Sequence, residues 1–216
     1  MDLFSTTTAA VPLAVYMLVL GAQHLRRRPR LQTGFADTML LGMSISGMVL
    51  VGPLDLFVPE TAAYRFGWFF RVLLLVLYLL VLLLVAISRR PRMIIYNARY
   101  RDVRTDIAKV VGALDASAYW AGRSAYLPTR GVDFFVDPES SSQTIQITSL
   151  SRDVNFSGWM ALRRKLTQAL GEHAVSPNPK AAWLIGGGVA ILLLAATFCA
   201  RDFPAFAQSF HEWLLR

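Results

Sequence analysis

Arginine provides the densest candidate chemistry in this 216-residue chain. Guanidinium groups beside a bilayer attract anionic lipid headgroups, at about 1 kcal/mol for each basic residue. Two arginine clusters lie directly next to long apolar segments, and their members are Arg26, Arg27, Arg28 and Arg30, then Arg89, Arg90 and Arg92. The clusters predict either contacts with anionic lipids or a role limited to fixing membrane topology.

Asp55 and Arg71 are charged residues near one end of otherwise apolar segments. Ionisable groups at membrane depth are costly and are often functional. Three alternatives stay open: both side chains extend to the nearby interface, they form a structural intramembrane ion pair, or they act in transport or in lipid-handling chemistry. The polar groups nearest the middle of these segments are the neutral Ser44 and Ser46, which favours the structural pair over an ion path.

The sequence contains none of the usual short catalytic motifs, such as HExxH, GxSxG, CxxC or a phosphate-binding glycine loop. Asp133 and Asp137 share one face of a predicted strand and Glu139 follows, which would suit acid–base chemistry or a divalent cation, but nothing else converges there. The topology derived below separates His211 from His24 and His173, so no metal site is expected. We therefore expect no cofactor, and the sequence favours a protein that is not an enzyme.

The composition indicates a membrane protein. Hydrophobic residues make up 55% of the chain and charged residues 17%, against about 25% charged residues in an average soluble domain. This hydrophobicity excludes a disordered chain, and the single cysteine, Cys199, excludes a disulfide scaffold. The apolar excess also argues against a purely soluble nucleic-acid-binding domain, although the net charge is +8.

Four apolar segments are long enough to cross a bilayer as helices, since a hydrocarbon core about 30 Å thick needs roughly 20 residues. No cleavage site follows the first segment, so it is expected to be an uncleaved span and not a secretory signal. Small residues in the second and fourth spans, such as Gly42, Ser46, Gly47 and 186–188, predict close contacts with other helices. The predicted spans cover residues 9–25, 38–58, 66–87 and 181–200.

The positions of Lys and Arg predict the orientation of the spans. Four basic residues lie between the first two spans and fourteen lie between residues 88 and 180, and basic loops favour the cytoplasmic side. Four alternating crossings place both groups on one side. We therefore expect a multi-pass protein of the bacterial cytoplasmic (plasma) membrane, with both termini outside and residues 88–180 in the cytoplasm.

Residues 88–180 have the pattern of a small α+β domain. The apolar periodicity predicts a two-layer domain with a mostly antiparallel sheet, in the order strand, helix, three or four strands, helix. Residues 137–142 are expected to form a loop, and Phe156 to lie on the buried face of the last helix. The predicted elements are strands at 92–97, 118–120, 124–127, 132–136 and 144–149, and helices at 102–114 and 156–170.

The last segment, 201–216, places Phe206, Phe210, Trp213 and Leu214 on one helical face. This pattern predicts an interfacial amphipathic helix on the outer leaflet.

Several stretches carry a resemblance to known proteins, namely 52–60 (GPLDLFVPE), 92–97 (RMIIYN), 120–123 (WAGR) and 158–159 (GW). On these residues the chain resembles a group of uncharacterised bacterial membrane proteins. The resemblance implies four spans with a cytoplasmic α+β domain. It implies no activity and no site residue.

Two classes of function remain. We expect a non-enzymatic scaffold or partner-binding component of a membrane complex, whose partner is another protein or a second copy of the chain. The alternative is a small transporter or lipid-handling membrane enzyme, or a sensor of anionic lipids. Nucleic acid is not favoured, because the basic domain is expected to lack both interleaved exposed aromatic residues and a recognised binding motif.

Overall fold

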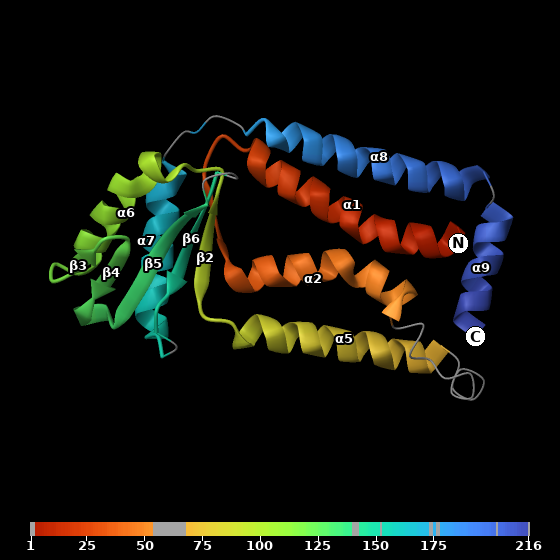
Figure 1. Ribbon diagram of the computed structural model, residues 1–216, viewed down its shortest axis with the longest axis horizontal. Coiled ribbons are helices and arrows are strands. Elements are labelled where there is room, and N and C mark those ends of the chain that lie inside the picture. The colour runs from red at the N-terminus through yellow and green to blue at the C-terminus, as the bar shows by residue number, and fades with distance from the viewer. Residues whose placement is uncertain are drawn as a thin grey trace. The chain divides into compact units, whose positions relative to one another are not determined.

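The structure is a computed structural model that describes residues 3–53, 68–139, 143–151, 153–172, 175, 178–201 and 203–215. The chain forms two compact units (Figure 1). The helical unit consists of Met1–Gly21, Thr38–Ala86 and Ala182–Arg216. The sheet unit consists of Ala22–Asp37 and Ile87–Ala181.

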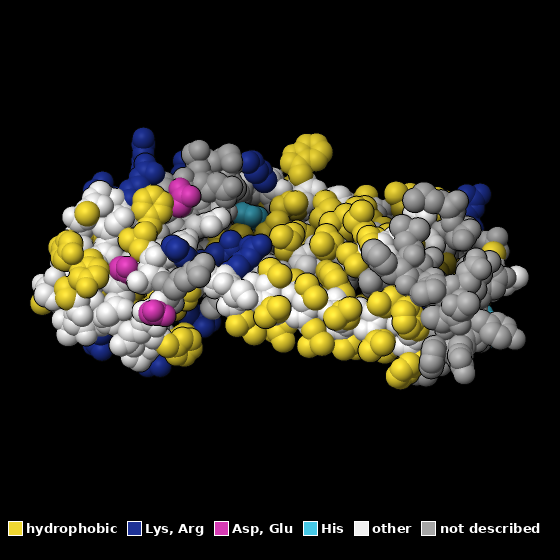
Figure 2. Space-filling model, turned by 60° about the horizontal axis from the view of Figure 1, so that its bottom comes forward, with side chains coloured by type: hydrophobic (Ala, Val, Ile, Leu, Met, Phe, Trp, Pro, Cys, Tyr) yellow, Lys and Arg dark blue, Asp and Glu magenta, His cyan; other side chains and the backbone are white. Residues whose placement is uncertain are grey.

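Within the described residues, four helices are long and apolar enough to cross a membrane: α1 (Leu3–Leu25), α2 (Gly34–Val51), α5 (Trp68–Ser88) and α8 (Lys180–Arg201). They match the four predicted segments, although α1 and α2 begin earlier than expected, and residues 54–58 lie outside the described residues. Large apolar side chains point outward from these helices, including Leu77, Leu80 and Leu84 of α5. Figure 2 shows this apolar surface.

A proline and a glycine define the contact between α1 and α2. Pro12 lies inside α1 and has no N–H to donate to the carbonyl of Thr8, four residues earlier. A side chain added at Gly47 of α2 would collide with this Thr8 carbonyl and would also touch the Pro12 ring. The missing side chain of Gly47 therefore lets α2 approach α1 where Pro12 has interrupted the helical hydrogen bonds.

Glycines also bring α8 against α1 and α5 against α2. A Cβ at Gly188 would meet the Ala14 carbonyl oxygen at 2.9 Å, and one at Gly42 would collide with Leu82 of α5. The Tyr78 hydroxyl donates a 2.7 Å hydrogen bond to the Gly42 carbonyl. The predicted small-residue contacts are thus confirmed for Gly42, Gly47 and Gly188, whereas a Cβ at Gly186 would meet only open space.

The last helix, α9 (Phe203–Leu215), lies in the segment predicted to be helical, and its interfacial location stays a prediction. Its Phe206 and Phe210 rings lie 5.7 and 5.6 Å from the ring of Phe4 in α1. Part of the apolar face of α9 therefore packs on protein. The side chains of Trp213 and Leu214 lie outside the described set.

The sheet unit contains one antiparallel sheet with strand order β1-β2-β6-β5-β4-β3. From β2 onward the elements follow the predicted order of strand, helix, four strands and helix. The edge strand β1 was not predicted, because residues 30–33 were expected to form a loop. The strands are β1 (Arg30–Thr33), β2 (Arg92–Tyr96), β3 (Tyr119–Ala121), β4 (Ser124–Leu127), β5 (Val132–Glu139) and β6 (Thr144–Ser149).

Two helices, α6 (Tyr100–Leu114) and α7 (Phe156–Gly171), cover one face of this sheet. Every second strand residue points into the shared core, which includes Met93, Phe134 and Ile147. Trp159, Leu162, Leu166 and Leu170 of α7 are buried there as predicted. The prediction for Phe156 was wrong, because this side chain is 74% exposed at the first position of α7.

Strand β5 is longer than predicted and includes Asp137, Pro138 and Glu139. Pro138 is tolerated because β4 pairs with β5 only up to Phe135. The N–H of Val136 donates a hydrogen bond to the Arg123 carbonyl, on the β4 side of β5. Because strand residues alternate, the nitrogen of Pro138 also points to this side, where β4 no longer pairs with β5. Proline fits such an edge position, since no ladder bond is lost.

A buried carboxylate joins the end of α6 to the turn before β5. Asp115 accepts hydrogen bonds from the N–H and hydroxyl groups of Ser117 and of Thr129. The hydrogen bond from the Ser117 hydroxyl is the largest cause of a low pKa of about 2 for Asp115. Asp115 therefore stays ionised and holds two turns of the sheet unit together.

The glycine contacts generate a test with a matched control. Gly47→Ala and Gly188→Ala should each destabilise the helical unit by about 1–3 kcal/mol, because the added methyl group forces tightly packed backbones apart. Gly186→Ala should leave stability unchanged or raise it by up to about 1 kcal/mol, since alanine favours a helix. Thermal unfolding of the full chain in detergent measures the difference. Equal melting temperatures for all three variants would contradict the packing.

Candidate functional site

The candidate site lies where β1 leads into α2. The antiparallel pairing sets Arg30 opposite Tyr96 and Thr33 opposite Met93. Thr33 then caps α2, since its hydroxyl oxygen accepts a 3.3 Å hydrogen bond from the N–H of Ala36. Asp37 falls in the first turn of α2, where a negative charge interacts favourably with the helix dipole.

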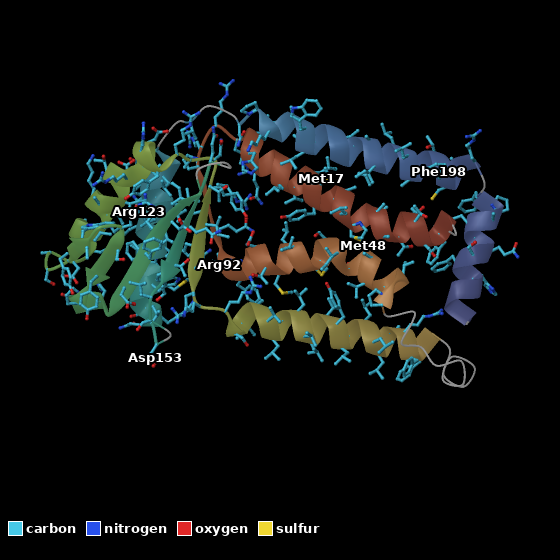
Figure 3. The ribbon with its side chains drawn as sticks, in the orientation of Figure 1. Met17, Met48, Arg92, Arg123, Asp153 and Phe198 are labelled. Carbon is cyan, nitrogen blue, oxygen red and sulfur yellow. The ribbon has the colours of Figure 1, made fainter. Side chains whose placement is uncertain are left out.

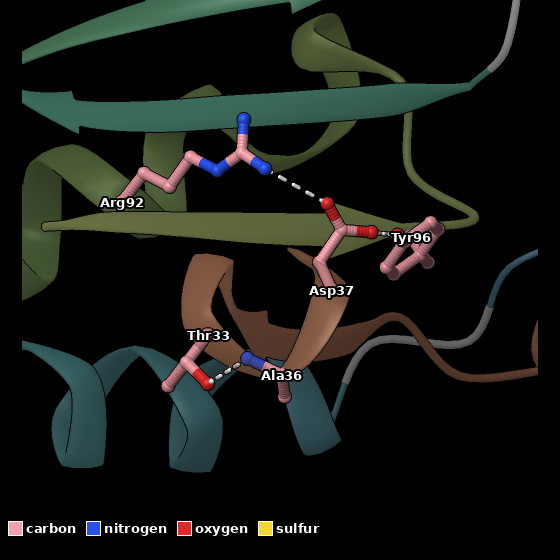
Figure 4. Close-up of polar contacts among 5 residues, drawn as sticks. All are labelled: Thr33, Ala36, Asp37, Arg92 and Tyr96. Atoms are coloured by element: carbon pink, nitrogen blue, oxygen red, sulfur yellow. Dashed lines mark hydrogen bonds and ion pairs between the residues drawn. The ribbon is translucent and has the colours of Figure 1, made fainter. Parts of the chain in front are cut away.

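Asp37 bridges two residues of β2 (Figure 4). Its Oδ2 lies 3.0 Å from Nη2 of Arg92, and its Oδ1 accepts a 2.6 Å hydrogen bond from the Tyr96 hydroxyl. Both charged side chains of the ion pair are 21% exposed. Arg92 reaches Asp37 across Gly34, where any Cβ would collide with the Arg92 side chain. A glycine at the start of α2 is therefore required for this ion pair.

The turn that follows the carboxyl end of β2 is fixed by a contact with the backbone of the first arginine cluster. Asn97 has a positive φ of 58°, and its side-chain amide donates a 2.5 Å hydrogen bond to the Arg26 carbonyl. The carbonyls of His24 and Arg27 accept hydrogen bonds from the N–H groups of Asn178 and Val175. The segment before β1 is thus held between the turn after β2 and the segment before α8.

The seven arginines predicted to contact lipid divide into two kinds. Arg92 forms an ion pair with Asp37, and Arg90 donates a 3.0 Å hydrogen bond to the Leu150 carbonyl. Arg90 still has an exposed side chain, as do the remaining members: Arg26, Arg27, Arg28, Arg30 and Arg89. The remaining members lie at different ends of the β1–β2 pair, since Arg26, Arg27 and Arg28 precede β1 on the side of Tyr96, whereas Arg89 and Arg90 precede β2.

The proposed intramembrane pair stays a prediction. Arg71 is buried in the first turn of α5, with 9% exposure. Asp55, its predicted partner, lies outside the described residues.

The predicted carboxylates do not converge on one site. Asp133 and Asp137 do lie on one face of β5, as predicted, but their positions differ by four residues, or roughly 13 Å. Asp133 accepts a 3.2 Å hydrogen bond from the N–H of Ser151 and so orders a loop. Among the described residues, no group of three or more His, Cys, Asp or Glu side chains is placed to hold a metal ion.

An exposed aromatic surface, which sequence analysis did not single out, lies on the β3–β4 hairpin. The hairpin surface is formed by Tyr119 and Tyr126, which are 57% and 42% exposed on one face of the hairpin, whereas Trp120 is 38% exposed on the opposite face. Tyr119 lies directly opposite Tyr126 with ring centroids 5.3 Å apart, and Trp120 packs edge-on against Phe134. The spacing of aromatic residues around the Gly122 turn is the signal that could have identified this surface.

Comparison with known proteins gives no relative. No protein-family model, no curated protein and no solved structure matches the chain. The resemblance described above therefore stays a prediction.

The Asp37 contacts generate a second test. Asp37→Ala removes the acceptor of both bonds from β2, at a cost of about 1–3 kcal/mol, and Tyr96→Phe removes one bond, at about 0.5–1.5 kcal/mol. Hydrogen exchange of the full chain in detergent should accelerate in β1 roughly tenfold for Asp37→Ala and less for Tyr96→Phe. The β5–β6 amides serve as the internal control. Unchanged exchange in β1 would show that Asp37 does not hold this strand.

Proposed function

We propose that the chain is an integral membrane protein whose sheet unit, on the cytoplasmic side, binds a protein partner. The observation that carries the proposal is the hairpin surface of Tyr119 and Tyr126. Aromatic side chains are enriched in protein interfaces, because they bury a large apolar area with few rotatable bonds. These two exposed rings, paired at one edge of the sheet, favour partner binding over catalysis.

The strand pairing supports the membrane topology. Residues 30–33 connect α1 to α2, whereas residues 92–96 follow α5, yet the two segments form adjacent strands of one sheet. If α1, α2 and α5 cross a bilayer, both segments must lie on the same side of it. This agrees with the arginine count, which assigns both clusters to the cytoplasm.

The sheet order also suits a partner in the cytoplasm. β1, which the chain joins directly to α1 and α2, is one edge of the sheet, and β3 is the other. Five strand spacings of 4.7–4.9 Å separate them, or roughly 24 Å. The hairpin surface therefore lies at the sheet edge farthest from the strand that connects two spans.

Contact with anionic lipid is a second candidate function, favoured by the exposed side chains of Arg26, Arg27, Arg28, Arg30 and Arg89. Since these residues adjoin the predicted spans, the two functions are compatible. They differ in salt dependence, because an arginine–headgroup contact weakens as ionic strength rises.

Cysteine labelling tests the topology. In a Cys199→Ser background, Gln168→Cys places a thiol on the exposed face of α7 and Ala207→Cys places one on α9. A membrane-impermeant maleimide should label Ala207→Cys in intact cells and Gln168→Cys only after the membrane is permeabilised. The opposite pattern, or labelling of both thiols in intact cells, would overturn the proposed orientation.

Photo-crosslinking tests partner binding. A benzophenone amino acid in place of Tyr126 should give a crosslinked product of one defined mass in membranes, because the side chain lies on the hairpin surface. The same amino acid in place of Gln168, which is exposed on α7, is the matched control. A product of twice the chain mass identifies a second copy as the partner. Equal product patterns at both positions would exclude the hairpin as a specific surface.

A further inference from the structure

The helical unit contains a groove between α1 and α8 with a volume of about 290 Å³. Its lining includes Thr6 and Ala10 of α1 and Ile191, Leu194, Ala195 and Phe198 of α8. Ala195 is 8% exposed and forms part of the floor, whereas Leu194 and Phe198 are 57% and 49% exposed. Figure 3 shows Phe198 near the carboxyl end of α8.

The residues that line the groove are mostly apolar and therefore favour an apolar ligand. The residues on α8 are spaced three and four apart, so they form one continuous stripe along the helix. Both helices are apolar enough to cross a membrane, and the medium around such helices is hydrocarbon. Small side chains such as Ala10 and Ala195 leave the space, and the acyl chain of a lipid has the shape and polarity to fill it.

A cationic side chain lies beyond one end of the groove. Arg201 follows Phe198 by three residues and Leu194 by seven, so it continues the same stripe. Its side chain is exposed in the last turn of α8. The seven residues from Leu194 to Arg201 correspond to roughly 10 Å along the helix, which places a positive charge at one end of an apolar groove.

We propose that α1 and α8 bind one phospholipid, with an acyl chain in the groove and the headgroup phosphate on Arg201. Charge complementarity selects the phosphate, because a guanidinium group forms paired hydrogen bonds with phosphate oxygens. A long arginine side chain at a helix end also reaches the interface, where the phosphate lies. The proposal rests on the membrane location of the helical unit proposed above.

Photo-labelling of the full chain in nanodiscs tests the site. The probe is phosphatidylglycerol with a diazirine in one acyl chain, diluted in unmodified phosphatidylglycerol, and adducts are located by mass spectrometry. Labelling of segments 3–10 and 191–198 should exceed labelling of 72–84 in α5 at least fivefold. Leu77, Leu80 and Leu84 of α5 are 54%, 56% and 64% exposed, so labelling governed by exposure alone would favour α5.

Variants separate the two parts of the site. Arg201→Gln should reduce labelling of 191–198 about fivefold, and Arg201→Lys should retain most of it. Ala10→Phe should fill the groove and remove the preference for the two segments, whereas Leu193→Phe, on an exposed face outside the groove, should preserve it. Since Arg201 is exposed, Arg201→Gln tests the site even if Ala10→Phe does not fold.

Three outcomes would overturn the proposal. Equal labelling of α5 and the groove segments would show that no lipid is held specifically. Unchanged labelling in Arg201→Gln would remove the phosphate contact. Labelling of none of the four helices would contradict the membrane location itself, and so the proposed function, whereas the first two outcomes would leave that location intact.

Discussion

The antiparallel pairing of β1 with β2 is the contact that determines how the start of α2 meets the sheet. It fixes Thr33 opposite Met93, and α2 begins at the next residue, so the register determines where the first turn of α2 lies. Asp37 is thereby brought to Arg92 and Tyr96. A shift of one residue would turn the β1 side chains to the opposite face of the sheet and would separate these partners.

The helical unit is held by a different kind of contact. Its helices approach through glycines that lie against backbone carbonyls, as Gly47 does against Thr8 and Gly188 against Ala14. In a membrane, apolar side chains would gain little by moving from hydrocarbon into a helix interface, so close packing would have to supply the attraction between the helices. Pro12 adds to this, because it frees the Thr8 carbonyl beside which Gly47 packs. The position of Pro12 in the sequence thus coincides with the contact between α1 and α2.

Local patterns predicted most of the fold, because apolar runs and periodicity depend only on neighbouring residues. The four long helices and the alternating strand β6 follow from such patterns. β1 could not be predicted, since Arg-Leu-Gln-Thr has no strong strand signal and becomes a strand only by pairing with residues 60–66 positions away. The Asp37–Arg92 pair could not be predicted for the same reason. Pro138 led to the prediction of a loop, but it lies in a part of β5 that has no neighbouring strand on one side, because β4 begins opposite Phe135.

The two edges of the sheet impose different constraints on any partner. The β1 edge is tied through Asp37 and Thr33 to the start of α2, whereas the β3 edge presents the hairpin surface. A partner at the hairpin therefore reaches α1 and α2 only through successive strand pairings, and a packed antiparallel sheet resists shear across its ladders. Coupling across this distance requires an element with two arrangements. Five strand pairings separate β3 from β1, so under the proposed function a partner bound at β3 would influence α2 only through a rearrangement of one of these pairings.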